Sequence, residues 1–480
     1  MSLQTRLTCV FLALAACGPA APPDEAPEPL GGGGGSQGHG GGQPIAELGI
    51  RFLVNARPHD AAPVWVDAEQ GRWVDPMRVV IEGLEPGELI RLETNLGSWA
   101  ELEADADGVV DLATEVPRDG SWLVADADAI FWSAPPSDTT AFDVELHVES
   151  IDTPGRTVSR SFHRVSLDTG VTATALDDGT TVGVLVRPEG LRAGVKRPAV
   201  LVFGGSEGGT FSGSIQAHYL AQLGYVTMGV GYFAAPGLPA DLDRVPLEIL
   251  QADLELLAAQ PDVDSTRIAV MGGSRGGELA LILGAYFPER VRAVVAQVPS
   301  GYVWGSLAGS DTSAWTYQAE ELPFVPRGDA FPDSYNEDGA LHYVLTPMFQ
   351  RSLDEASEAA RAMATIQVQN TNGPILFLGA EDDALWPSCD FSEVSWDLLD
   401  ANGHHDQHPD SFHCLSGAGH SAVGLPGLST IESEAYYSPE NQAWMDLGGT
   451  PEGNGRAQRE ANTLTRAFLE TALSFHESGF

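Results

Sequence analysis

The sequence is poor in lysine, in basic residues as a whole and in cysteine. It has 25 Lys and Arg residues against 67 Asp and Glu residues, which gives a formal net charge of −42. Such a negative surface repels phosphate backbones and anionic lipid headgroups, so the composition argues against nucleic-acid binding. Lys196 is the one lysine, so any catalytic role for a lysine has a single candidate. Extended disorder is also disfavoured, because 43% of the residues are hydrophobic, as in folded proteins.

The length of 480 residues predicts two folded domains and an appendage. The apolar stretch from Leu7 to Ala16 is too short to span a bilayer but has the proportions of a secretory signal. Small residues before Cys17 resemble the bacterial lipoprotein box, which predicts a lipoprotein signal peptide at 1–17 and a lipid on Cys17. The alternative is an ordinary signal peptide in which Cys17 is incidental. The Gly- and Pro-rich segment 18–45 reads as a flexible tether, so we expect an exported protein, anchored by lipid to the bacterial cell envelope.

Four cysteines are present, and two of them lie in or beside the signal segment. The other two, Cys389 and Cys414, would be free to form a disulfide in an oxidising compartment. The sequence leaves open whether they pair or are two separate small hydrophobic residues. Their spacing has no metal-site pattern, so neither is a predicted zinc ligand.

Residues 46–165 are predicted to form an immunoglobulin-like β-sandwich. Short apolar runs alternate with Gly, Pro and Asp turn signals every 8–12 residues or so, without a helical period. The predicted strands are 78–82, 89–94, 98–104, 109–114, 121–124, 142–148 and 157–165. Nothing in this part carries a catalytic constellation, so we expect a supporting domain.

Residues 166–480 alternate between strand and helix patterns, which predicts an α/β domain with a doubly wound sheet. The predicted strands are 198–203, 225–230, 267–271, 291–297 and 374–378, and the predicted helices are 213–223, 247–259 and 278–286. The runs at the strands are continuously apolar, as expected for parallel strands covered on both faces.

A Gly-x-Ser-x-Gly motif, Gly272 to Gly276, lies between a predicted buried strand and a predicted helix. In that context the tight turn lifts the hydroxyl of Ser274 above the sheet edge, as in the nucleophile elbow of α/β-hydrolases. The backbone N–H of Arg275 would then help to hold an oxyanion. An ordinary helix-capping serine is the alternative.

A serine nucleophile needs a histidine base that a carboxylate orients, and the chain order in this fold is Ser, acid, His. The strand 374–378 runs into an acidic cluster in which Asp382 and Asp383 compete for the acid role, ahead of Glu381. His420 follows in a loop between glycines. These residues predict a catalytic triad of Ser274, His420 and one of the two aspartates.

The glycine-rich segment 204–209 is expected to give the second oxyanion donor, near Gly205 or Ser206. It lacks the Gly-Lys-Ser/Thr of a phosphate-binding loop. The histidines at 404, 405 and 408 read as an exposed loop rather than as a metal site. The segment 301–351 lies where such folds insert a cap over the site.

The chain resembles the acyl-CoA thioesterases and bile acid-CoA:amino acid N-acyltransferases along nearly all of its length beyond the tether. Several short motifs occur in the same order as in that family. They are Gly83-Leu-Glu-Pro-Gly87, Phe131-Trp-Ser-Ala-Pro135, Pro236-Gly-Leu-Pro239, Val245-Pro-Leu-Glu248, Asp382-Asp-Ala-Leu-Trp-Pro-Ser388, Gly417-Ala-Gly-His420 and Gly448-Gly-Thr-Pro451. So many motifs in one order are more specific than the serine motif alone.

This resemblance implies a serine-nucleophile bacterial member of the family, with Asp383 as the catalytic acid beside Ser274 and His420. The family's N-acyltransferases use a cysteine nucleophile, so Ser274 implies hydrolysis of an acyl thioester without cofactor or metal. The partner is then a small-molecule thioester or ester. An exported carboxylesterase and an acyltransferase with the same triad remain alternatives, as does a binding protein without activity. Coenzyme A esters are cytoplasmic, and an acidic surface offers little grip on the coenzyme's phosphates, so the family's substrate is the part of the resemblance that transfers least.

Overall fold

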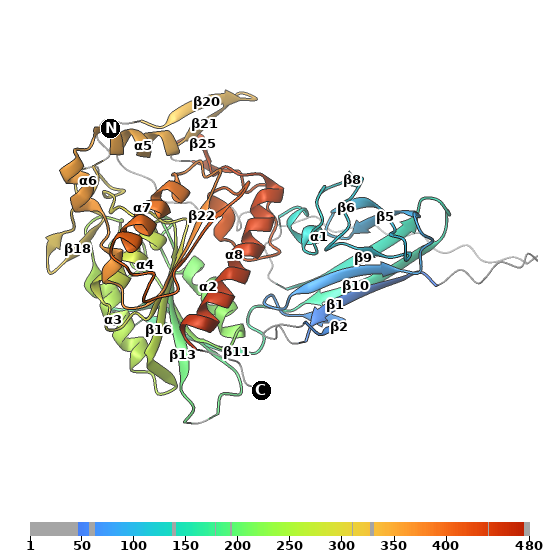
Figure 1. Ribbon diagram of the computed structural model, residues 1–480, viewed down its shortest axis with the longest axis horizontal. Helices are drawn as coiled ribbons and strands as arrows, with labels where there is room; N and C mark the ends of the chain where they lie inside the picture. Colours follow the sequence, from blue (N-terminus) through green and yellow to red (C-terminus); the bar gives the residue numbers. More distant parts are fainter. Residues whose placement is uncertain are drawn as a thin grey trace, which may run out of the picture.

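The computed structural model describes residues 47–474, apart from 57–62, 137–140, 178, 193, 310, 327–330 and 440. The expected signal peptide, Cys17 and the whole tether lie outside the described residues. Two bodies are visible in Figure 1, a domain of strands and a larger domain of helices around a sheet.

The first body is a β-sandwich of two sheets. Its four-stranded sheet consists of β2 (Trp65–Asp67), β1 (Gly49–Asn55), β4 (Met77–Glu82) and β7 (Val110–Asp111). Its six-stranded sheet consists of β3 (Gln70–Gly71), β10 (Thr157–Arg164), β9 (Phe142–Ser150), β5 (Leu89–Thr94), β6 (Trp99–Glu103) and β8 (Asp119–Gly120). Buried and partly buried residues alternate along β4, as expected when one face of a strand points into the core. Residues 121–124, predicted as a strand, lie outside any strand, because the chain turns there toward the short helix α1 (Ala129–Trp132).

An eight-stranded mixed sheet forms the second body. Its strands, in spatial order, are β11 (Val171–Asp177), β12 (Val182–Pro188), β14 (Val226–Val230), β13 (Arg197–Phe203), β16 (Val263–Gly273), β17 (Ala293–Gln297), β22 (Ile375–Ala380) and β23 (Ser411–Leu415). β12 runs antiparallel to both of its neighbours, β11 and β14, and β14 in turn pairs parallel with β13. This strand order is that of the α/β-hydrolase fold, as the sequence predicted.

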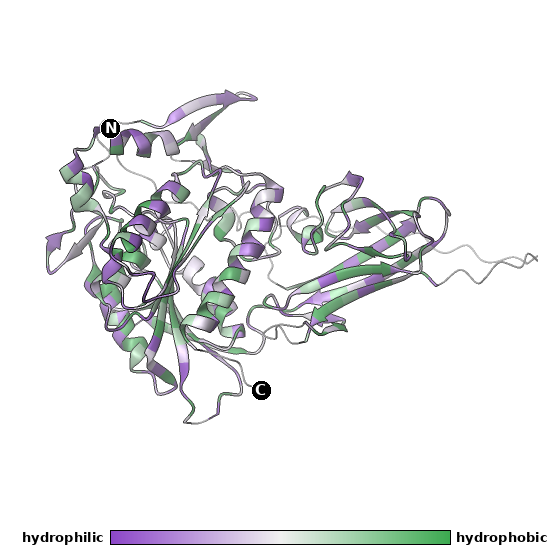
Figure 2. Ribbon diagram, viewed as in Figure 1, coloured by the Kyte–Doolittle hydropathy of each residue, from purple (hydrophilic) through white to green (hydrophobic). Residues whose placement is uncertain are grey.

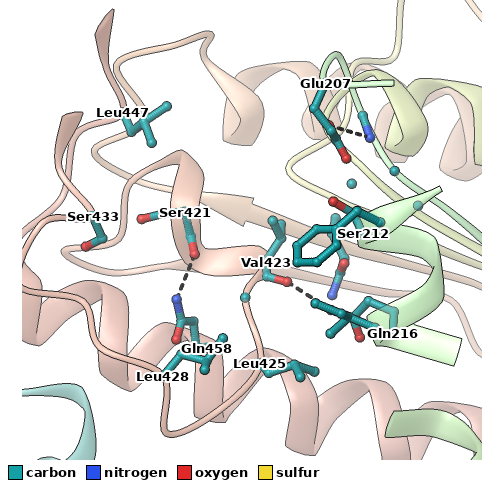
Figure 3. A pocket seen from close by; sticks show the side chains of 18 of the residues that line it. Glu207, Ser212, Gln216, Ser421, Val423, Leu425, Leu428, Ser433, Leu447 and Gln458 are labelled. Atoms are coloured by element: carbon teal, nitrogen blue, oxygen red, sulfur yellow. Dashed lines mark hydrogen bonds between the residues drawn. The ribbon is translucent and has the colours of Figure 1, made fainter. Parts of the chain in front are cut away.

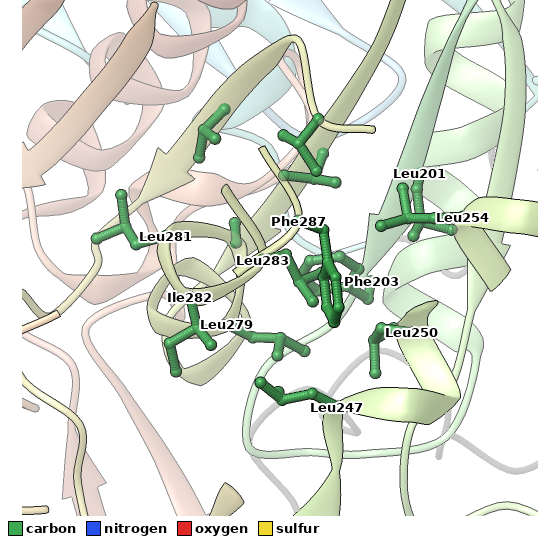
Figure 4. Packing of buried hydrophobic residues seen from close by; sticks show 14 of the residues in the cluster. Leu201, Phe203, Leu247, Leu250, Leu254, Leu279, Leu281, Ile282, Leu283 and Phe287 are labelled. Atoms are coloured by element: carbon green, nitrogen blue, oxygen red, sulfur yellow. The ribbon is translucent and has the colours of Figure 1, made fainter. Parts of the chain in front are cut away.

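Helices cover both faces of this sheet. Alternate residues of β13 separate the two cores: Leu201 and Phe203 face one, and Val200 and Val202 face the other. The first core packs against α3 (Leu247–Ala258), α4 (Arg275–Tyr286) and α7 (Ser388–Ala401), and Figure 4 shows its leucines around Phe203. The second packs against α2 (Phe211–Gln222) and α8 (Pro451–Ala472). Figure 2 shows the apolar residues gathered in the sheet between these helices.

The segment predicted as a cap folds beyond the strand ends into small elements. They are β18 (Trp315–Tyr317), β19 (Glu320–Glu321), β20 (Asp333–Glu337), β21 (Ala340–Val344) and the start of α5 (Thr346–Glu355). A helix α6 (Glu358–Ala364) follows. β18 pairs with β15 (Val245–Pro246), and β21 pairs with β25 (Ala443–Asp446), which in turn pairs with β24 (Ala435–Ser438). These pairings tie the inserted segment to the chain before α3 and after β23.

The β-sandwich contacts the second domain at α8 and the loop before it. Asp126 forms an ion pair with Arg459, and the backbone N–H of Thr430 donates to the Trp132 carbonyl at 2.9 Å. A methyl group on Gly455 would lie 2.5 Å from Trp132 Cγ, so the indole packs directly on the helix backbone. The sandwich therefore packs against the segment that follows His420.

Candidate active site

Ser274 occupies a strained turn between β16 and α4. Its φ of 59° and ψ of −123° lie in a region that residues other than glycine rarely adopt. Such a conformation costs roughly 1–3 kcal/mol. A methyl group on Gly272 would lie 2.4 Å from the Gly276 carbonyl oxygen, and one on Gly276 would lie 2.2 Å from the Gly204 carbonyl oxygen. The motif needs its glycines because these backbones touch.

His420 begins the short turn η2 (His420–Val423), after β23, and is 1% exposed. Its Nδ1 lies 2.9 Å from Asp383 Oδ2 and 3.1 Å from Oδ1, and Oδ1 also accepts the backbone N–H groups of Leu385 and Trp386. The Asp383 side chain is itself buried. Its neighbour Asp382 is exposed. The carboxylate in contact with the histidine is thus the one that the family resemblance implied.

The other ring nitrogen of His420, Nε2, is buried and has no hydrogen-bond partner. Trp386 connects this ring to the serine: the indole packs edge-on against the imidazole with centroids 5.9 Å apart, and it lines the same small pocket as Ser274. A methyl group on Gly273 would also contact Val423 at 3.6 Å, at the end of η2. The structure thus brings Ser274 and His420 to the same edge of the sheet.

Of the predicted oxyanion donors, Gly205 is engaged elsewhere. Its N–H donates to Glu207 Oε2 at 2.9 Å. Ser206 lines the small pocket together with Ser274 and Arg275, and the N–H of Arg275, first in α4, has no acceptor within the helix. Arg275 and Ser206 therefore remain as the candidate donors.

A buried ion pair lies directly behind the serine, and the sequence did not reveal it. Arg275 Nη1 lies 2.8 Å from Glu278 Oε2, with the two side chains 4% and 0% exposed. Arg275 donates to the Trp304 and Gly305 carbonyls, and Glu278 accepts the Trp315 indole N–H at 2.6 Å. Burial raises the pKa of Glu278 to about 7 against the opposing attraction of Arg275. The pair fastens the inserted segment to the turn that carries the nucleophile.

Two cavities flank the serine. The smaller, of about 40 Å³, is lined by Ser274, Ser206, Arg275 and apolar side chains that include Leu345, Met348, Phe349 and Trp386. Most of these apolar residues come from the segment predicted as a cap or from its border. The larger cavity, of about 200 Å³, is lined by Gly272 and Gly273, which precede the nucleophile, and by Gly204 and Gly205; Figure 3 shows it from close by.

No group of metal-ligating side chains suited to a metal ion occurs among the described residues. The histidines at 404 and 405 each place Nδ1 against Asp410 Oδ2, at 2.7 and 2.9 Å. His404 is buried, which corrects the prediction of an exposed loop, because Asp410 and the Thr371 carbonyl supply partners for both of its ring nitrogens. This cluster is a structural contact within the loop that joins α7 to β23.

Cys389 and Cys414, whose pairing the sequence left open, form a disulfide. It links the start of α7 to the last parallel strand, β23. Among the described residues, no helix combines the length and apolar character that a membrane crossing requires.

Comparison with known proteins agrees with this geometry. Residues 245–474, which include all three triad candidates, match the family described as BAAT / acyl-CoA thioester hydrolase C terminal. The chain is 24% identical over 430 residues to acyl-coenzyme A thioesterase 6 of Mus musculus, which covers 84% of this chain and 94% of that protein. It is 25% identical over 409 residues to acyl-coenzyme A thioesterase 1 of Homo sapiens, which covers 78% of this chain and 92% of that protein.

A solved structure, a thermostable esterase from Pseudomonas putida ECU1011, superposes with a TM-score of 0.38 at 18% identity, over 65% of this chain and 86% of that one. The family match covers the whole sequence from β15 to α8, including the nucleophile turn, the acid and the histidine. Residues 245–474 of this protein therefore form a domain of the BAAT / acyl-CoA thioester hydrolase C-terminal family.

Proposed function

We propose that this protein is a serine hydrolase that cleaves acyl thioesters through an acyl-enzyme on Ser274. The acyl-coenzyme A thioesterases among its relatives support a hydrolase acting on thioester or ester bonds. One observation carries the finer proposal. The buried His420 is held at Nδ1 by Asp383 and keeps an unpartnered Nε2, at the sheet edge where Ser274 adopts its strained turn.

In the proposed reaction, Ser274 Oγ attacks the acyl carbonyl carbon while His420 Nε2 takes the hydroxyl proton. Asp383 keeps the proton of the neutral ring on Nδ1 and stabilises the imidazolium that forms. The backbone N–H groups of Arg275 and Ser206 hold the oxyanion. His420 then protonates the leaving thiolate, deprotonates a water molecule and allows it to release the carboxylic acid from the serine.

The leaving group is the least supported part of the proposal. Lys196 is exposed and precedes β13, whereas the nucleophile follows the carboxyl end of the parallel strand β16. The lone lysine thus lies at the opposite edge of the sheet and offers no contact to the phosphates of a coenzyme A ester bound at Ser274.

Matched acyl-CoA and p-nitrophenyl ester series, assayed with the purified protein and with Ser274→Ala, test the proposal. Hydrolysis of acyl-CoA that disappears in the variant is the expected result. Hydrolysis of the esters alone would keep the mechanism and replace the thioester by an ester. Equal rates for the protein and its variant on every substrate would overturn the proposal.

We also propose that the protein is exported and anchored by a lipid on Cys17. The small residues before this cysteine and the Gly-rich segment after it support the proposal. Replacing Cys17 by Ser should move the protein from the membrane fraction to the soluble fraction, whereas the matched change Cys9→Ser should not. An unchanged distribution for Cys17→Ser would contradict the anchor.

A further inference from the structure

The larger cavity beside Ser274 has mostly apolar walls, but several oxygen atoms of its polar residues receive no hydrogen bond from the protein. We name it the acceptor-lined pocket. Its apolar walls include Phe203, Ile215, Met271, Val423, Leu425 and Leu428, and its acceptors belong to Glu207, Gln216, Ser421 and Gln458. Figure 3 shows Glu207 on one side and Ser421 with Gln458 on the other.

Each of these four polar side chains has a buried oxygen that lacks a partner. The atoms are Glu207 Oε1, Gln216 Oε1, Ser421 Oγ and Gln458 Oε1. Gln458 is 5% exposed as a residue. The Ser212 hydroxyl favours the ionised form of Glu207, but burial has the larger effect and raises the pKa of that carboxyl. Buried polar atoms are nearly always hydrogen-bonded. The oxygens of Glu207, Gln216 and Gln458 therefore indicate a ligand that donates hydrogen bonds, and the Ser421 hydroxyl can accept one as well.

The two amides cannot turn to supply donors themselves. Gln216 Nε2 donates to the Val423 carbonyl at 3.2 Å, and Gln458 Nε2 donates to the Ser421 carbonyl at 3.0 Å. Flipping either amide would place two oxygens against each other. The backbone of η2, which begins at His420, therefore fixes both amide oxygens as acceptors.

The acceptor-lined pocket lies beside the nucleophile. Gly205 and Gly273 both line it. A methyl group on Gly205 would lie 3.1 Å from Ser274 Cβ and 3.2 Å from Glu207 Oε2, so the serine and the carboxyl flank the same glycine. Gly205 and Gly273 therefore place the pocket next to the serine that would carry the acyl group.

We propose that the acceptor-lined pocket binds the acyl part of the substrate and selects acyl groups that carry hydroxyl groups. The inference rests on the proposed function and names its substrate class. A plain alkyl chain would fill the apolar walls but leave the four oxygens unpaired, whereas a hydroxylated chain satisfies both. Satisfying one such oxygen is worth about tenfold in kcat/KM.

The test compares p-nitrophenyl hexanoate with its hydroxyhexanoate isomers, using the full-length protein, Gln216→Leu and Gln458→Leu. We expect the best hydroxylated ester to exceed the plain ester in kcat/KM by about tenfold or more, and each leucine variant to lose most of that preference. Gln222→Leu is the matched control. Gln222 lies on the same helix as Gln216 and is 4% exposed, but its amide holds the Ser166, Leu167 and Thr169 carbonyls, away from the pocket. This control should lower stability and leave the preference intact.

Two further substrates distinguish failure of the pocket proposal from failure of the proposed function. The glycerol ester of hexanoic acid carries hydroxyl groups on its leaving group instead of on its acyl group, and the propyl ester is its comparison without them. A preference that appears only there would overturn the acyl assignment. Equal rates on plain and hydroxylated acyl groups in all variants would overturn the pocket's role while leaving the hydrolase intact, whereas loss of the proposed function would show as no Ser274-dependent hydrolysis of any ester.

Discussion

The Arg275 guanidinium and the Glu278 carboxylate form a buried ion pair at 2.8 Å, one helical turn along from the nucleophile. Through the Trp304 and Gly305 carbonyls and the Trp315 indole, this pair joins the nucleophile turn to the inserted segment. Because a buried pair is weak evidence of stability, its contribution has to be measured.

The pH dependence of unfolding tests the state of Glu278. Burial raises its folded-state pKa to about 7 from the ordinary 4.5. The folded protein therefore holds this proton more tightly than the unfolded chain, and the group's contribution to stability falls as pH rises between these values, by roughly 3 kcal/mol. Glu278→Gln lacks this loss, so between pH 5 and pH 7 its free energy of unfolding should improve relative to the wild type by about 2 kcal/mol.

Denaturant melts at several pH values supply this comparison. Glu255→Gln is the control, because Glu255 pairs with Arg290 at the surface and its loss also removes one negative charge. Curves for the wild type and Glu278→Gln that stay parallel over the whole range would show that Glu278 titrates as an ordinary carboxylate.

Strain at Ser274 predicts that two inactive variants of this residue differ in stability. Ser274→Ala and Ser274→Gly should both lower kcat by about 10³-fold or more, because each lacks the nucleophile. Glycine tolerates the φ of 59° that Ser274 adopts, so the glycine variant should be more stable than the alanine variant by about 1 kcal/mol.

Thermal melts of both variants measure this difference. The matched position is Ser214, inside α2. There the order should reverse, with Gly less stable than Ala by about 1 kcal/mol, as in any helix interior. If Ala were also the more stable residue at 274, the turn would carry no strain.

Much of this site was predictable because chain order and local pattern carry it. The Gly-x-Ser-x-Gly turn, the acidic cluster after a buried strand and the glycine-flanked His420 are all visible in the sequence. Burial of a carboxyl is not, so Glu207 and Glu278 were missed: nothing local distinguishes them from surface glutamates. The edge strand β11 was missed for a related reason, since most of its residues are exposed and lack an apolar run. The disulfide depends on which elements pack together, and spacing alone left it open.

The choice between two adjacent aspartates gives a sharp test of the proposed mechanism. Asp383→Asn should lower kcat by about 10⁴-fold, because an amide no longer holds His420 in the tautomer that accepts the serine proton. Asp382→Asn should leave kcat within about twofold, as is usual for an exposed residue away from the reacting groups. Comparable losses in the two variants, or a loss confined to Asp382→Asn, would remove Asp383 from the proposed role.

The disulfide between Cys389 and Cys414 closes a loop of 25 residues that precedes His420. Cross-linking a loop of that length should stabilise the folded protein by about 3 kcal/mol. Cys389→Ser with Cys414→Ser should therefore melt several degrees lower than the wild type. Because neither cysteine lines the two cavities beside Ser274, the double variant should keep its kcat well below the melting temperature.

Dithiothreitol should lower the melting temperature of the wild type toward that of the double variant and leave the variant unchanged, since Cys414 is exposed to the reductant. A double variant as stable as the wild type would mean that packing of α7 against β22 and β23 holds this region without the covalent link.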